Sequence, residues 1–269
     1  MYPLAFSTLG CPAWTLEQAA DAAVANGYAG LEIRLLGSEV IPADLSARQR
    51  HEVRQIVADR GLTIIGLGAS TRFSAPDAAE RRRQEDELRR YLDLAAELGA
   101  GMVRTFGGQL AEGATLEQTA AWLAGSLQAV MPAAEATGVT VMLETHDAFC
   151  RGRDVALVLA QIDHPRMQII WDLHHSYRMG ESIEETWQQI GSRVGHVHIK
   201  DAVRREDGTW QLVLLGQGEV PNRAAIDLLS REGYEGYLSV EWEKKWHPEI
   251  PDPEIALPQH ARLLREWMS

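Results

Sequence analysis

The chain has 269 residues, of which 45% are apolar, and a formal net charge of −12 from 26 basic and 38 acidic side chains. This length and composition suit a folded domain, and the acidic balance argues against nucleic-acid binding, which requires clustered Lys and Arg. With two cysteines, no signal peptide and no apolar run of membrane-spanning length, the sequence predicts a soluble, cytoplasmic protein without a membrane partner.

Short β-rich runs alternate with longer helical patterns eight times along the chain. The predicted strands are Leu4–Thr8, Gly30–Arg34, Leu62–Gly68, Met102–Phe106, Val139–Thr145, Met167–Asp172, Val194–Lys200 and Tyr237–Glu243. Between them, apolar residues such as Leu88, Leu92 and Ala95 recur at three- and four-residue spacing, which is typical of amphipathic helices. Because strands that alternate with helices pair in parallel, these units predict an α/β fold, a (β/α)8 TIM barrel forming a single domain over residues 1–269.

The predicted connections also carry turn signals. Several helical patterns end at a glycine shortly before the next strand, which predicts left-handed caps at Gly27, Gly61, Gly99, Gly138 and Gly233. Residues 203–220 read as a hairpin around Asp207-Gly208 followed by a loop, and Lys244–Pro258, with its four prolines, reads as an irregular segment. Both segments are expected on the side of the barrel where the loops after the strands build active sites.

Polar side chains close four consecutive predicted strands: Glu144, Asp172, His198 and Glu241. Such residues are costly to bury unless they are paired or bind a metal. Any one of them alone would more often be a capping or salt-bridging group. Because the C-terminal ends of barrel strands converge, all four together predict a shared divalent cation. Three carboxylates and one imidazole are oxygen-rich ligands, so Mn²⁺ is the expected ion, with Mg²⁺, Co²⁺ and Zn²⁺ as alternatives.

Four motifs surround these residues: Leu-Glu144-Thr-His, Trp-Asp172-Leu-His-His175, His196-Val-His198-Ile-Lys-Asp and Val-Glu241. They resemble motifs of the sugar phosphate isomerase/epimerase family, which has a xylose isomerase-like barrel, and the resemblance covers nearly the whole chain. It implies the same four metal ligands. It also implies that His175 and Arg204 face the substrate.

The resemblance further implies that Glu144 and Glu241 are catalytic acid/base groups as well as ligands. Proton transfer through a metal-bound enediolate would then make the protein a sugar, keto-sugar or inositol-like isomerase or epimerase. The alternative is a lyase or dehydratase that uses the same site on a keto-sugar, keto-glycoside or keto-inositol. Ketose epimerases of this group carry a glutamate six positions beyond the strand-five ligand, where this chain has Cys150. This departure leaves the particular reaction open.

Four further residues are predicted to contact the substrate: Lys200, His146, Arg104 and Trp246. The alternative for Lys200 is an ion pair with a ligand carboxylate. The alternative for Arg104 is to neutralise the carboxylate-rich C-terminal end of the barrel. Trp246 lies in the predicted loop after the eighth strand, which is longer than in the simplest epimerases and is expected to close over substrate.

Two residues are predicted to lie near the ligands without binding the metal. His196 shares a strand face with His198 by period-two alternation, so it is expected one layer deeper, as a partner of the ligands. Glu32 ends the second predicted strand, where it is expected to meet the substrate.

The expected partner is a small-molecule carbohydrate. A DNA-repair endonuclease built on the same barrel would need a multi-zinc cluster and a basic surface, which the charge of −12 disfavours. A non-enzymatic carbohydrate-binding role remains an alternative. Helix-rich barrels of this kind often pair, so a homodimer is an open alternative to a monomer.

Overall fold

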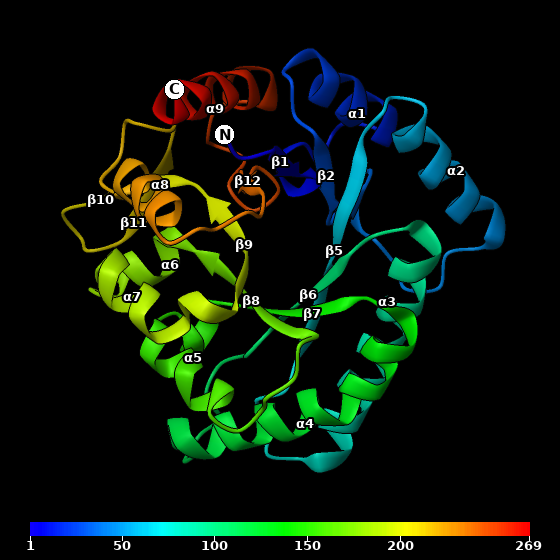
Figure 1. Ribbon diagram of the computed structural model, residues 1–269, viewed down its shortest axis with the longest axis vertical. Coiled ribbons are helices and arrows are strands. Elements are labelled where there is room, and N and C mark those ends of the chain that lie inside the picture. The colour runs from blue at the N-terminus through cyan, green and yellow to red at the C-terminus, as the bar shows by residue number, and fades with distance from the viewer.

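A computed structural model, which describes residues 1–269, shows a closed barrel of parallel strands in the order β1-β12-β9-β8-β7-β6-β5-β2 (Figure 1). These strands are β1 Leu4–Ser7, β2 Gly30–Ile33, β5 Thr63–Arg72, β6 Met102–Phe106, β7 Thr140–Glu144, β8 Met167–Asp172, β9 Val194–Ile199 and β12 Leu238–Val240. The predicted (β/α)8 barrel is confirmed.

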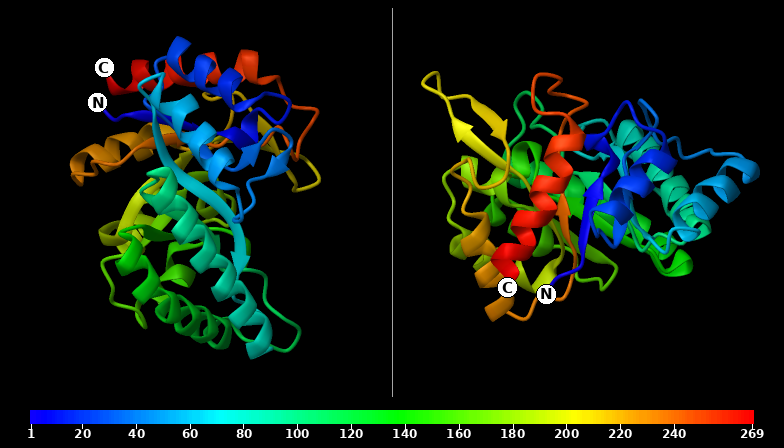
Figure 2. Two further views of the ribbon diagram at one scale, coloured as in Figure 1. Left: turned by 90° about the vertical axis from the view of Figure 1, so that its right-hand side faces the viewer. Right: turned by 90° about the horizontal axis from the view of Figure 1, so that it is seen from above.

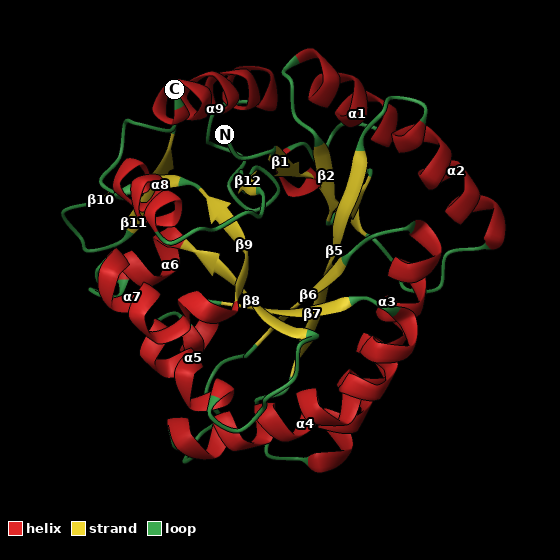
Figure 3. Ribbon diagram, in the orientation of Figure 1, coloured by secondary structure: helices red, strands yellow, loops and turns green.

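Helices form the outer layer around the strands (Figure 3). They are α1 Leu16–Ala25, α2 Ala47–Ala58, α3 Ala78–Leu98, α4 Leu116–Thr137, α5 Gly152–Leu159, α6 Leu173–Arg178, α7 Ile183–Ile190, α8 Asn222–Arg231 and α9 Pro253–Met268. Helices α1, α2, α4 and α7 begin at a capping box, in which a Ser or Thr and the third helical residue satisfy each other's backbone N–H groups. None of the helices is long and apolar enough to cross a membrane.

The turn signals are confirmed in most places. All of the predicted cap glycines have a positive φ, between 67° and 75°. The predicted hairpin consists of β10 (Asp201–Arg204) and β11 (Trp210–Val213), which pair antiparallel and project beyond the barrel strands (Figure 2).

Four details differ from the prediction. Strand β12 covers Leu238–Val240 and is shorter than the predicted Tyr237–Glu243. Strand β5 continues to Arg72, beyond the predicted end at Gly68. Helix α9 begins at Pro253, inside the segment predicted to be irregular, because a proline at the first helical position loses no hydrogen bond. A short antiparallel pair, β3 (Leu35–Leu36) with β4 (Glu39–Val40), was not predicted.

The barrel interior changes from apolar to polar along strands β6, β7 and β8. A small buried apolar layer is formed by Ala5, Ile65, Met102, Met142 and Ile170. Side chains two positions apart on a strand share a face. The residues two positions beyond Met102, Met142 and Ile170 are Arg104, Glu144 and Asp172, and all three are buried. These three strands therefore contribute both to the apolar layer and to a polar layer at their C-terminal ends.

Close packing between β2 and β5 generates a stability prediction. A Cβ added at Gly30 would lie 2.6 Å from the Thr63 carbonyl oxygen and 2.8 Å from Ile65 Cγ1. We expect Gly30→Ala to lower the free energy of unfolding by about 1–3 kcal/mol, measured by urea denaturation.

The matched control is Gly125, which is exposed in α4 with nothing within 4 Å of an added Cβ. Gly125→Ala is expected to raise the free energy of unfolding by about 0.5–1 kcal/mol, because alanine loses less backbone entropy in a helix. Equal stability of the two variants would contradict the close approach at Gly30.

Candidate metal centre

Four strand ends place the predicted ligands together. Glu144 and Asp172 are the last residues of β7 and β8, His198 lies in β9, and Glu241 directly follows β12. All four side chains are buried, and one ligand atom from each lies within 4.8 Å of the others. The structure therefore brings together the residues chosen from sequence, while their role as metal ligands stays a prediction.

Two buried, positively charged side chains, Lys200 and Arg104, neutralise these carboxylates. Lys200 Nζ lies 2.6 Å from Glu241 Oε2 and 2.9 Å from Asp172 Oδ2. Arg104 Nη1 lies 3.0 Å from Glu144 Oε2 and 3.7 Å from Glu241 Oε1. Lys200 and Arg104 were each predicted either to contact the substrate or to neutralise the acidic residues. These distances match the second interpretation for both side chains.

The two carboxylate oxygens of Asp172 have different surroundings. Its Oδ1 accepts the backbone N–H of His175 at 3.0 Å and so caps helix α6. Its Oδ2 is buried and has no hydrogen-bond donor, because the nearby Lys200 ammonium lies outside hydrogen-bonding geometry. Burial raises the pKa of Asp172 to about 6, although the Lys200 charge opposes the shift. A donor-free carboxylate oxygen among three other ligand groups fits a divalent cation.

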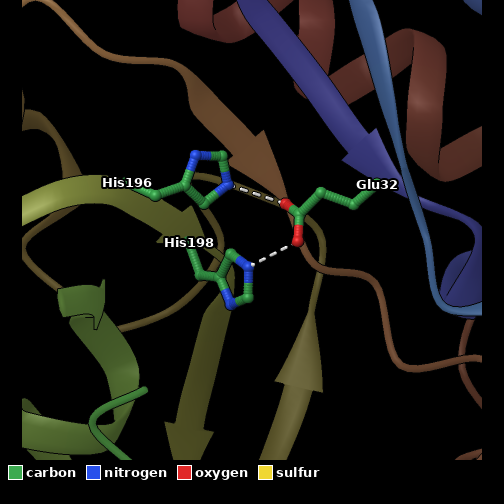
Figure 4. Close-up of side chains that lie close together, drawn as sticks. All are labelled: Glu32, His196 and His198. Carbon is green, nitrogen blue, oxygen red and sulfur yellow. Dashed lines mark hydrogen bonds and ion pairs between the residues drawn. The ribbon is translucent and has the colours of Figure 1, made fainter. Parts of the chain in front are cut away.

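Glu32 is held by two histidines, His196 and His198 (Figure 4). Its Oε1 lies 2.7 Å from His196 Nε2, and its Oε2 lies 3.1 Å from His198 Nε2. The Ser239 hydroxyl also donates to Oε1. Burial acts to raise the pKa of Glu32, but His198 and His196 hold it well below its ordinary value. Glu32 is therefore an ionised internal acceptor, and the expectation that it meets the substrate is not supported by this placement.

This contact orients His198. Because an ionised carboxylate only accepts hydrogen bonds, the Nε2 that faces Glu32 carries the proton. The other ring nitrogen, Nδ1, then faces the cluster, 3.2 Å from Glu144 Oε1 and 3.5 Å from Glu241 Oε2. Carboxylates that orient a metal-binding histidine through its second nitrogen are a common feature of metal sites. The expected deeper position of His196 agrees with its contact to Glu32.

The predicted substrate-binding residues divide into two groups. His146 and His175 line a cavity of about 370 Å³ beside the cluster, with their ring centroids 4.7 Å apart. Arg204 is exposed at the end of β10, opposite Trp210 in the hairpin, and Trp246 is 51% exposed after β12. The structure does not bring Arg204 or Trp246 to the four predicted ligands.

Several residues of this cavity were not singled out from sequence: His174, Arg178, Trp210 and Glu243. Glu243 lies two positions beyond Glu241, so period-two alternation was a usable signal. His174 and Arg178 lie on α6, a helix of six residues that has too few turns for a periodic pattern. Trp210 reaches the cavity through the predicted hairpin, where its ring lies 5.4 Å from that of His174, a contact between separate elements.

Fold and site together define a (β/α)8 barrel with a candidate metal centre at the C-terminal ends of its strands. The family model described as "Xylose isomerase-like TIM barrel" matches residues 20–267, so the chain belongs to that family.

Known relatives are similar over much of the chain. Fructoselysine 3-epimerase of Escherichia coli O157:H7 is 26% identical over 246 residues, covering 87% of this chain and 88% of that protein. 3-Oxo-isoapionate decarboxylase of Pectobacterium atrosepticum is 29% identical over 179 residues, covering 65% of this chain and 59% of that protein.

Two solved structures show the same fold. L-ribulose 3-epimerase superposes with a TM-score of 0.83 at 20% identity, covering 100% of this chain and 95% of that one. The IOLI protein, described with a binding zinc atom, superposes with a TM-score of 0.81 at 18% identity, covering 99% of this chain and 96% of that one.

The Glu32 contacts predict a large stability effect. Glu32→Ala leaves His196 and His198 buried without their shared acceptor, so we expect the free energy of unfolding to fall by about 3–5 kcal/mol. Glu32→Gln keeps one acceptor oxygen and should lose less. The control is Glu206→Ala, at an exposed position of the hairpin, which should match the wild type. Urea denaturation followed by circular dichroism measures all three, and a Glu32→Ala variant of wild-type stability would refute the arrangement.

Proposed function

We propose that the protein is a divalent-metal-dependent epimerase that acts beside the carbonyl of a ketose or related keto-sugar. The observation that carries the proposal is the placement of Glu144 and Glu241. Strands β8 and β9 lie between β7 and β12 in the barrel, so the two glutamates flank Asp172 and His198. Relatives and fold neighbours with epimerase names support the same reaction class.

The proposed ligands of the cation are Glu144, Asp172, His198 and Glu241. Held there, a divalent cation would polarise a substrate carbonyl and its neighbouring hydroxyl. Glu144 and Glu241 then have complementary tasks: one, as the carboxylate, removes the proton from the carbon beside the carbonyl, and the other, which has first taken a proton from solvent, returns that proton to the opposite face. The first glutamate then releases the removed proton to solvent. His146 and His175 are proposed to hold the sugar hydroxyls in the adjoining cavity.

Both glutamates are ionised before the substrate binds, so either can serve as the base, and the other takes up a solvent proton before it acts as the acid. Burial and the neighbouring Glu241 act to raise the pKa of Glu144, but Arg104 and His198 hold it below its ordinary value. Burial likewise opposes ionisation of Glu241, and Lys200 with His198 holds its pKa well below the ordinary value. Each carboxylate is therefore ionised at neutral pH and can accept a proton.

Lyase chemistry is the second candidate. The same enolate-forming site breaks a bond to a neighbouring group if that group leaves before a proton returns. Two observations favour it: Cys150 stands where the resembling ketose epimerases carry a glutamate, and one relative is named a decarboxylase.

Solvent isotope incorporation tests the proposal. The Mn²⁺-loaded protein is incubated in D2O with D-tagatose, D-psicose, L-ribulose and keto-sugar acids, and the products are analysed by NMR and mass spectrometry. We expect an epimer that carries one deuterium at the inverted carbon and has lost no group. Glu144→Gln and Glu241→Gln should each lower kcat by about 10²–10⁴-fold, whereas the exposed control Glu206→Gln should not.

A product that has lost water or carbon dioxide would show that the protein is a lyase and not an epimerase. Turnover that is unchanged in both glutamine variants would overturn the assigned roles of Glu144 and Glu241.

Metal removal gives a second test. Dialysis against a chelator should abolish activity, and Mn²⁺ should restore it more fully than Zn²⁺. Mn²⁺ at 100 times its Kd should raise the free energy of unfolding by about 2.7 kcal/mol. Asp172→Asn should weaken Mn²⁺ binding in calorimetry, while Glu206→Gln should not. Protein that binds no stoichiometric divalent ion would rule out the metal centre.

A further inference from the structure

The cavity beside the candidate metal centre contains one charge without a partner. Glu243 is paired with Lys200, and Asp147 Oδ1 lies 3.1 Å from His146 Nδ1. Arg178 is half-buried at the end of α6, and no carboxylate lies within 4.0 Å of its guanidinium nitrogens. Its Nη2 lies 3.7 Å from the sulfur of Cys150, which is a weak hydrogen-bond acceptor.

A second polar side chain in the same cavity also lacks a partner. His174 is 3% exposed, and neither of its ring nitrogens has a hydrogen-bond partner. In either protonation state the ring has at least one N–H to donate. A buried imidazole with both nitrogens unsatisfied is rare in proteins unless a ligand or water completes it.

The helix brings these two groups to one place. His174 and Arg178 lie four residues apart on α6, so they share a face of the helix. His175, one residue after His174, reaches the candidate metal centre, where its Nδ1 lies 3.8 Å from Asp172 Oδ2. Three residues of helix, a rise of about 4.5 Å, separate His175 from Arg178, and both residues line the same cavity. A substrate that reaches the metal centre can therefore extend its far end to Arg178.

We propose that Arg178 and His174 form an anion subsite that binds a carboxylate at the end of the substrate distal to the reacting carbon. This inference rests on the proposed function and narrows its substrate class to keto-sugar acids. A planar guanidinium binds a carboxylate through two parallel hydrogen bonds, and the His174 N–H can add a third. A phosphate fits less well, because it carries more charge than one arginine neutralises.

Three ligands with the same first five carbons test the subsite: D-fructose, D-fructuronate and D-fructose 6-phosphate. Dissociation constants are measured by calorimetry with the Mn²⁺-loaded protein. We expect D-fructuronate to bind about 10- to 100-fold more tightly than D-fructose, as for a charge-assisted hydrogen-bonded pair. Arg178→Gln should remove that preference, and His174→Phe should reduce it.

The matched control is Arg205→Gln, which removes the same charge from the exposed hairpin outside the cavity and should keep the preference. An absence of preference for the acid, or a preference that survives Arg178→Gln, would overturn the subsite. Tighter binding of the phosphate would overturn the carboxylate assignment. Because binding is measured without turnover, failure of the epimerase proposal would appear separately, as missing deuterium incorporation despite a preserved preference for the acid.

Discussion

The burial of three carboxylates within a few ångströms of one another is the constraint on which the rest of this structure depends. Glu144, Asp172 and Glu241 are each almost wholly removed from solvent, and like charges about 4 Å apart repel by about 4 kcal/mol at a typical protein dielectric. Arg104 and Lys200 offset part of this repulsion. The pKa of His198 is raised well above its ordinary value despite burial, because Glu241 and Glu32 favour its charged form. A bound cation would take over that role.

The barrel scaffold provides room for these compensating groups. An added Cβ at Gly68 would lie 2.9 Å from Arg34 Cδ and 3.2 Å from Arg104 Nη2, so the absence of a side chain there lets two guanidinium groups lie side by side. Arg34 donates to the Gly68 carbonyl oxygen at 2.6 Å and so does not compete with Arg104 for Glu144. The glycine-rich part of β5 thus contributes to the electrostatics of the site and not only to strand packing.

Sequence reasoning succeeded where one local rule decides the outcome and failed where distant segments meet. Period-two alternation places Asp172 and His198 on the inner face of the barrel, and the convergence of strand ends then brings them together. The contact between Glu32 and His196 spans 164 positions, so no local pattern predicts it. Arg204 matches a family motif, but β10 continues past the barrel into a hairpin and carries it outward. Helix α9 begins at Pro253 because proline suits the first position of a helix. The number of prolines alone predicted an irregular segment there.

Reaction and specificity are encoded in different parts of this chain. The carboxylates proposed to move protons come from barrel strands, whose geometry is shared across the fold. The cavity that would hold the rest of the substrate is lined by α6 and the hairpin, where single substitutions change the charge without disturbing the barrel. Cys150 shows how. It is buried, and burial raises its thiol pKa, so it offers Arg178 a neutral neighbour. A carboxylate at this position would give the guanidinium a permanent partner, whereas a thiol leaves its charge available to a ligand.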